Sequence, residues 1–222
     1  MRHSTRPGTI IATGLVLILM ISTANALFLE KRSALEVAGG WWNEANSVTA
    51  SVGPTGQVTT AANDGGRISL GYVHWPRENL GLNISVGLLR SSADVRIIDR
   101  HFDVSSVNII PIMLGIRYYL PPSTFSTSWR PYLTAGIGPV IGTVSKTAVN
   151  LDVIQESQSA VAFGSFLGAG LNIGLSRYFI FESSLGYRII NDFSETIAGR
   201  DNYSGPEINF GLGLLLNAGL GN

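Results

Sequence analysis

Apolar residues recur at every second position in eight segments of this chain. In the clearest segment, residues 80–88, Leu, Ile or Val alternates with Gly, Asn and Ser. A period of two is typical of a β-strand with two different faces. The other seven segments are residues 35–42, 67–72, 110–119, 132–142, 167–175, 179–189 and 208–217. We therefore expect an all-β protein of eight strands, of the kind that crosses a membrane with roughly 9 to 11 tilted residues each.

The composition of the second face indicates which side of these strands meets lipid. Soluble barrels of the lipocalin kind also alternate, but with the apolar face inward. Here the second face consists mainly of Gly, Ser, Asn and Ala, not of the Lys, Glu, Gln and Thr that a solvated exterior carries. Small residues suit the narrow interior of an eight-stranded barrel, and the bulky aliphatic face suits lipid. The pattern favours a transmembrane up-and-down antiparallel β-barrel over the soluble alternative.

Short and long connections alternate between the eight segments. Residues 75–79, 120–128 and 176–178 are short, whereas residues 47–65, 91–103, 145–159 and 191–205 are long. Three short turns and four long loops fit a barrel with both chain ends in the periplasm and long extracellular loops. Pro111 and Pro139 fall inside strands, where each removes one hydrogen-bond donor, so we expect bulges there or strands that have risen above the lipid.

Seven aromatic residues cluster beside the short turns. Aromatic belts mark membrane–water interfaces, so this cluster predicts a periplasmic girdle, although strands are enriched in aromatics generally. The seven residues are Trp75, Tyr118, Tyr119, Trp129, Tyr132, Tyr178 and Phe179.

The N-terminus has the pattern of an export signal. Arg2 and Arg6 precede an apolar run of about 12 residues, too short for the roughly 20 of a spanning helix. Ala24 and Ala26 are small residues at the positions that a signal peptidase reads. We predict cleavage between Ala26 and Leu27, with a signal peptide at residues 1–26 and a barrel domain at 27–222. An uncleaved anchor is the alternative.

Composition excludes several classes of function. Charged residues make up only 14% of the chain, Gly reaches 26 residues, and Lys+Arg and Asp+Glu balance at 15 each. No basic excess supports nucleic-acid binding. Cysteine is absent, which rules out disulfides, thiolate metal sites and a cysteine nucleophile.

Five charged residues alternate with the apolar face and are expected in the lumen. A buried charge is costly without a partner, so we predict that they pair in a network across the barrel. Rings of charge also select ions in pores, and this role stays open as the alternative. The five residues are Glu36, Arg67, Arg117, Glu182 and Arg188.

Catalysis has little support in the sequence. His74 is expected at the periplasmic end and His101 in a polar loop, and no HExxH, GxSxG, phosphate-loop or CxxC motif is present. We expect no catalytic residues, no cofactor and no metal site.

Four stretches resemble the small outer-membrane β-barrel proteins, the OmpX-like barrels and the barrel half of OmpA-like proteins. They are PIMLGIRYYL at 111–120, RPYLTAGIGPVIG at 130–142, GAGLNIGL at 168–175 and the final strand. In that strand Asn209, Gly211, Leu214 and Leu216 resemble the signal that the outer-membrane barrel assembly machinery reads. The family usually has aromatics where this chain has Leu.

The resemblance implies an integral protein of the cell outer membrane that contacts lipids and lipopolysaccharide. We expect a structural or surface-interaction role through the four long loops, with an extracellular ligand of those loops as a further partner. A small pore or transporter of small or apolar solutes is the first alternative, and a lipid A-modifying enzyme the second.

Overall fold

The computed structural model describes residues 29–43, 51–52, 58–61, 64–96, 104–121, 128–149, 153–195, 197 and 202–216. The predicted signal peptide, with Ala24, Ala26 and Leu27, lies outside these ranges, and so does His101. The described residues contain ten β-strands. They are β1 (Ser33–Asn43), β2 (Ser51–Val52), β3 (Val58–Ala61), β4 (Asp64–Arg77), β5 (Leu80–Arg96), β6 (Val104–Tyr119), β7 (Trp129–Val149), β8 (Val153–Gly174), β9 (Phe179–Ile190) and β10 (Gly205–Leu216).

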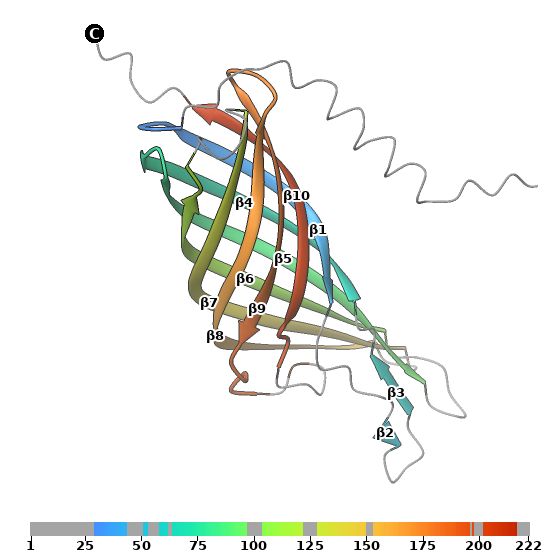
Figure 1. Ribbon diagram of the computed structural model, residues 1–222. Helices are drawn as coiled ribbons and strands as arrows, with labels where there is room; N and C mark the ends of the chain where they lie inside the picture. Colours follow the sequence, from blue (N-terminus) through green and yellow to red (C-terminus); the bar gives the residue numbers. More distant parts are fainter. Residues whose placement is uncertain are drawn as a thin grey trace, which may run out of the picture.

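Eight of these strands form a closed antiparallel barrel (Figure 1). Around the wall the order is β1, β4, β5, β6, β7, β8, β9 and β10, and β10 pairs again with β1. Closure leaves no sheet edge whose amide groups would lie unpaired in hydrocarbon. The short strands β2 and β3 lie beyond this wall, where β3 pairs with the end of β5. The predicted all-β barrel of eight strands is confirmed.

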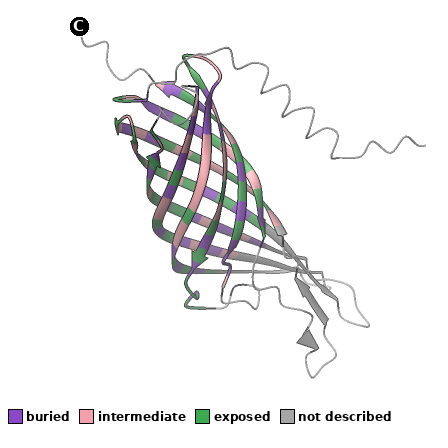
Figure 2. Ribbon diagram, viewed as in Figure 1, coloured by how far each residue is buried: buried purple, intermediate pink, exposed green. Residues whose placement is uncertain are grey.

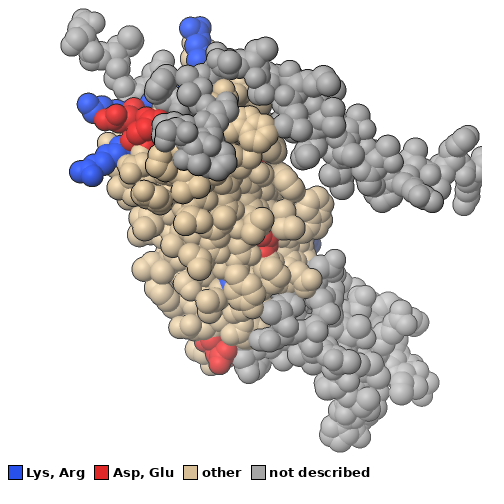
Figure 3. Space-filling model, viewed as in Figure 1, with Lys and Arg blue, Asp and Glu red and all other residues tan. Residues whose placement is uncertain are grey.

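The barrel wall alternates between the two faces that the sequence predicts. Outward side chains such as Leu167, Leu185 and Leu114 are 67%, 64% and 62% exposed, while the residues next to them in the strand are half-buried or buried (Figure 2). Figure 3 shows charged side chains gathered near the two ends of one face, with a mostly uncharged band between them. An apolar band with polar ends is the surface that a bilayer-spanning barrel presents to lipid.

Strands extend into two of the four predicted long loops, at residues 91–103 and 145–159. β5 continues to Arg96 and β6 starts at Val104, while β7 continues to Val149 and β8 starts at Val153. The ladder between β7 and β8 runs unbroken to the pair Val149 and Val153. The sequence suggested loops there because the apolar alternation stops. A strand pair that extends beyond the lipid still forms its backbone hydrogen bonds. Neither of its faces contacts lipid, so its sequence need not alternate between apolar and polar residues.

The bulges expected at the two prolines do not form within the described strands. Pairing between β6 and β7 stops after Pro111 and Val140 and resumes in the same register at Leu114 and Ile137. Here the two backbones come so close that a Cβ on Gly138 would overlap the carbonyl oxygen of Ile112. Pro139 thus lies in a two-residue gap of the β6–β7 ladder. Pro111 lies in a similar gap of the β5–β6 ladder, between the pairs Val86–Ile112 and Leu89–Ile109. Neither gap shifts the register.

Candidate functional site

The first group of lumen charges is centred on Arg117. Its guanidinium donates to both carboxylate oxygens of Glu36, at 2.8 and 2.9 Å, and to those of Glu182, at 3.2 and 3.3 Å. The Tyr132 hydroxyl donates to Glu182 at 2.7 Å, and the Arg117 guanidinium lies 5.1 Å from the Tyr132 ring centre. One cation thus joins two carboxylates contributed by β1 and β9, giving this group a formal charge of −1.

The second group is centred on Glu207. Arg67 donates to its carboxylate at 2.6 Å, and Arg188 donates through Nε at 3.0 Å and through Nη2 at 3.2 Å. Asn209 adds an amide donor at 3.2 Å. This group has a formal charge of +1 and balances the first. All five charges predicted for the lumen lie in these two groups.

Glu207 was missed by the sequence analysis. It lies between the connection at residues 191–205 and the alternating segment at 208–217, so neither included it. The signal was present in its position, because Glu207 lies two residues before the inward Asn209 and therefore points to the same face.

Each of the six charged side chains lies beside a glycine in a neighbouring strand. Glu36 is registered between Gly71 and Gly213, and Arg117 lies opposite Gly81. The other pairs are Arg67 with Gly40, Glu182 with Gly211, Arg188 with Gly205 and Glu207 with Gly186. An eight-stranded barrel leaves little interior space, and these glycines provide the room for long side chains to cross it.

A cavity of about 70 Å³ lies between the charged groups, lined by residues of both. Among its lining residues, Arg67 Nε, Arg188 Nη1, Asn83 Oδ1 and Asn209 Oδ1 are buried polar atoms without a protein partner. Ordered water is the usual partner of such atoms, and a space of this size holds only a few molecules. The cavity is far smaller than the 300 to 1,000 Å³ roughly typical of a small-molecule site.

A buried apolar cluster fills the lumen at the short-turn end. Its members are Leu29, Ala34, Val73, Trp75, Tyr119, Tyr132, Ile180 and Leu215. Three residues of the predicted girdle, Trp75, Tyr119 and Tyr132, belong to this cluster and do not face the membrane. The prediction was wrong for them because it counted aromatics near the turns and ignored the face on which alternation places each one. Tyr118, Tyr178 and Phe179 are exposed, and Trp129 is half-buried.

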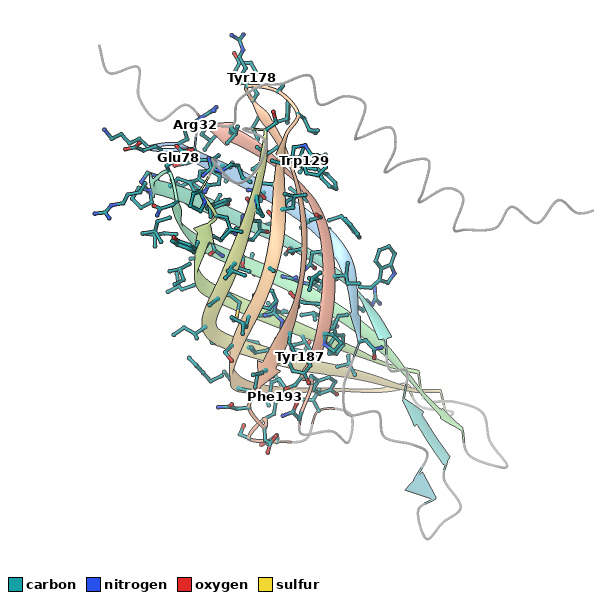
Figure 4. The ribbon with its side chains drawn as sticks, in the orientation of Figure 1. Arg32, Glu78, Trp129, Tyr178, Tyr187 and Phe193 are labelled. Atoms are coloured by element: carbon teal, nitrogen blue, oxygen red, sulfur yellow. The ribbon has the colours of Figure 1, made fainter. Side chains whose placement is uncertain are left out.

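A second apolar cluster closes the opposite end of the lumen. Its members are Trp42, Leu89, Val107, Ile109, Val140, Ala160, Ala162, Ile190, Phe193, Ile197 and Tyr203. Phe193, Ile197 and Tyr203 come from the connection between β9 and β10, which was expected to be an outward polar loop (Figure 4). Tyr203 stacks on Trp42 with ring centres 6.2 Å apart and donates its hydroxyl to the carbonyl of Ile197 at 2.5 Å. We call these three residues the mouth plug.

The described part of the chain offers little for catalysis or metal binding. His74 lies on the outward face of β4 at the short-turn end, where Ser33 is 3.0 Å from its Nδ1. Among the residues described, no group of three or more His, Cys, Asp or Glu side chains is placed to hold a metal ion. No helix in the described ranges is long and apolar enough to span a membrane.

Comparison with known protein families identifies the family to which this barrel belongs. The model of the outer membrane protein beta-barrel domain matches residues 13–214. The chain belongs to this family. A search of curated proteins gave no match. As a member of the family, the protein resides in the outer membrane, with its wall among the membrane lipids.

Solved structures of outer-membrane barrels share the fold at low sequence identity. The attachment invasion locus protein Ail of Yersinia pestis has a TM-score of 0.53 at 14% identity, covering 84% of this chain and 99% of Ail. Ail in complex with the heparin analogue sucrose octasulfate has a TM-score of 0.55 at the same identity and coverage. A major outer membrane protein of Thermus thermophilus has a TM-score of 0.52 at 14% identity, covering 83% of this chain and 98% of that one.

The residues of the expected assembly signal lie on both faces of β10. Asn209 and Gly211 point inward, whereas Leu214 is exposed and Leu216 half-buried on the outer face. Asn209 connects this strand to the second charge group, through Glu207, and to Ser184 of β9 at 3.4 Å. In this outer-membrane barrel, β10 is also the strand that closes the wall against β1.

Proposed function

We propose that this protein is a closed outer-membrane barrel with a structural and surface-interaction role, and neither a wide pore nor an enzyme. The observation that carries the proposal is the filled lumen. An apolar cluster lies at each end and a charge-neutral, ion-paired layer lies between them. Buried salt bridges resist separation because each charge would lose its partner in a place that water scarcely reaches.

The strands themselves supply a surface for interaction beyond the lipid. β7 and β8 have 21 and 22 residues, whereas β9 and β10 have 12 each. A difference of about nine residues is roughly 30 Å of strand. β5 and β6 are also long, and β3 pairs with the end of β5 (Figure 1). We call this extension of β5 to β8, with β2 and β3, the projecting sheet.

The projecting sheet lies at the end that we assign to the cell exterior. Short turns at one end and long excursions at the other are the usual arrangement of outer-membrane barrels. The strand ends that flank the four connections predicted as long extracellular loops lie toward this projecting end. The similarity to Ail, named as an attachment protein, supports attachment as the kind of interaction to test first. We also propose that β10 carries the segment that the barrel assembly machinery recognises.

Two measurements test the proposal. In planar bilayers the purified protein should give no large, steady conductance steps, and such steps would overturn the closed-barrel assignment. The second measurement compares bacteria that display the full chain with bacteria whose β7–β8 hairpin is shortened. The shortened chain replaces residues 144–158 with a two-residue Asn-Gly turn, which leaves the pair Thr143 and Ser159 next to the new turn.

Adherence to cultured epithelial cells is the readout for the two strains, with folding checked by heat-modifiable gel mobility and equal surface amounts checked by labelling of intact cells. Shortening the hairpin should reduce adherence. Unchanged adherence would overturn the role of the projecting sheet, while leaving the closed-barrel assignment to the conductance measurement.

A further inference from the structure

Cationic side chains gather at the short-turn end of the barrel. Lys31, Arg77 and Arg177 are exposed and Arg32 is half-buried. The acids at this end are Glu30, which is exposed, and Glu78, which pairs with Arg130. The described side chains of this end therefore carry a formal charge of +3. At the opposite rim, the exposed charged residues among the described side chains are Arg90, Asp192 and Glu195, with a formal sum of −1.

Backbone and side-chain hydrogen bonds hold these cations on one arc of the rim. The amide of Lys31 donates to the carbonyl of Trp75 at 2.7 Å, and the amide of Trp75 donates to the carbonyl of Arg32 at 2.9 Å. Arg32 Nη2 donates to the carbonyl of Arg177 at 2.7 Å. The start of β1, the end of β4 and the turn from β8 to β9 are thereby fixed together. Figure 4 shows Arg32 and Tyr178 at this upper end.

Polar groups interrupt the apolar outer wall on the same arc. Tyr72 on β4 donates its hydroxyl to Ser33 Oγ on β1 at 2.9 Å. Ser33 Oγ also lies 3.0 Å from His74 Nδ1, and this arrangement fits the tautomer in which Nδ1 accepts from the Ser33 hydroxyl. A neutral imidazole that accepts at Nδ1 carries its hydrogen on Nε2. The chain of three groups therefore leaves His74 with one N–H donor that has no acceptor among the described residues.

We propose that this arc binds the phosphate groups of anionic glycerophospholipids in the periplasmic leaflet. Lys31, Arg77 and Arg177 supply positive charge at headgroup level, and His74 Nε2–H supplies a directed donor just below them. Clusters of Lys and Arg beside a membrane segment attract anionic lipid headgroups in this way. Arg177 lies 4.6 Å from the ring centre of Tyr178, and Tyr178 and Phe179 are exposed where interfacial aromatics lie. The arc covers the neighbouring strands β4, β1, β10 and β9, which gives room for more than one headgroup.

Lipid retention measured by native mass spectrometry tests this site. The full-length mature protein is reconstituted in nanodiscs of equal parts phosphatidylglycerol and phosphatidylcholine, released, and examined for bound lipid. We expect phosphatidylglycerol to be retained in preference. The double variant Arg77→Gln/Arg177→Gln should reduce that preference by about fivefold for each charge removed. His74→Phe keeps a ring but removes the donor, and should reduce it further.

Arg90→Gln is the matched control, because it removes one exposed arginine from the opposite rim. It should leave the preference unchanged. An equal loss with Arg90→Gln, or no preference in the unmodified protein, would overturn the site. A third sample contains lipopolysaccharide; if lipopolysaccharide displaces phosphatidylglycerol from this arc, the assignment to a phospholipid and to the periplasmic leaflet fails. Heat-modifiable mobility confirms that each variant has folded, and the conductance and adherence measurements do not bear on the result.

Discussion

A Cβ atom on Gly170 would overlap the ring of Tyr132, so the ring occupies space that only glycine leaves. From that position the Tyr132 hydroxyl reaches Glu182 at 2.7 Å. The lack of a side chain at Gly170 in β8 thus allows Tyr132 to donate a hydrogen bond to the Glu182 carboxylate in β9.

Gly170→Ala should therefore destabilise the barrel. The ring must move, and overpacking of a filled interior costs about 1 to 3 kcal/mol. The free energy of unfolding in urea, measured in lipid vesicles, provides the test. Ala169→Val, on the outward face of the same strand, should change it by less than about 0.5 kcal/mol. Equal stability of Gly170→Ala and the unmodified chain would show that the Tyr132 ring is free to relax.

Glu207→Gln should be among the most damaging substitutions in the lumen. It leaves Arg67 and Arg188 buried without their shared carboxylate, for which a cost of about 3 to 5 kcal/mol is expected. Replacing all three residues by Leu or Met should recover much of that loss, since it removes the charges together. Glu30→Gln, at an exposed turn, serves as the control in the same unfolding measurement. A triple variant no more stable than Glu207→Gln would contradict this account.

The mouth plug should control access to the lumen from the projecting end. The chain contains no cysteine, so a thiol introduced as Ala162→Cys would be the only one present. Ala162 is buried in the same cluster as Phe193 and Ile197. Combining Phe193→Ala with Ile197→Ala should raise the rate at which a small maleimide labels this thiol. Ser159→Cys, on an exposed position of the same strand, should react at one rate in both backgrounds. If the two rates at position 162 are equal, the plug does not seal the mouth.

Leu185→Arg tests the depth of the barrel in lipid. Leu185 is strongly exposed near the middle of β9, and an arginine at the bilayer midplane costs about 2 to 4 kcal/mol. Folding yield in vesicles, read from heat-modifiable mobility, should fall for Leu185→Arg and much less for Leu185→Ala. A normal yield for Leu185→Arg would place this position near an interface or in water.

The alternating pattern was sufficient to predict the barrel and the direction of most wall residues. Leu35, Ile84 and Leu212 point outward as their period predicts, because in a wall of one layer the face of each side chain follows directly from its position in the strand. The five charges predicted for the lumen point inward for the same reason. Their partners depend on which strands lie side by side and in what register, and this information is not contained in any single segment.

The ends of the strands were harder to predict. Val144 to Val149 and Val153 to Gln158 are ladder residues, although their composition is that of a polar loop. Backbone hydrogen bonds hold such a hairpin with little help from an apolar face. Phe193, Ile197 and Tyr203 lay in a connection with no alternation, so nothing in their spacing indicated that they turn back into the lumen. For the aromatics at the short turns the sequence did contain the information, since alternation already placed Tyr119 and Tyr132 on the inner face.

The glycines registered beside the six lumen charges also restrict how the barrel can assemble. If a strand slipped by one residue, its side chains would change faces, and Arg117 or Glu182 would point into hydrocarbon while bulky aliphatic residues entered a space sized for glycine. The buried charge in hydrocarbon and the overpacked lumen would each raise the free energy of the slipped barrel. The lumen residues therefore favour one strand alignment over its one-residue slips.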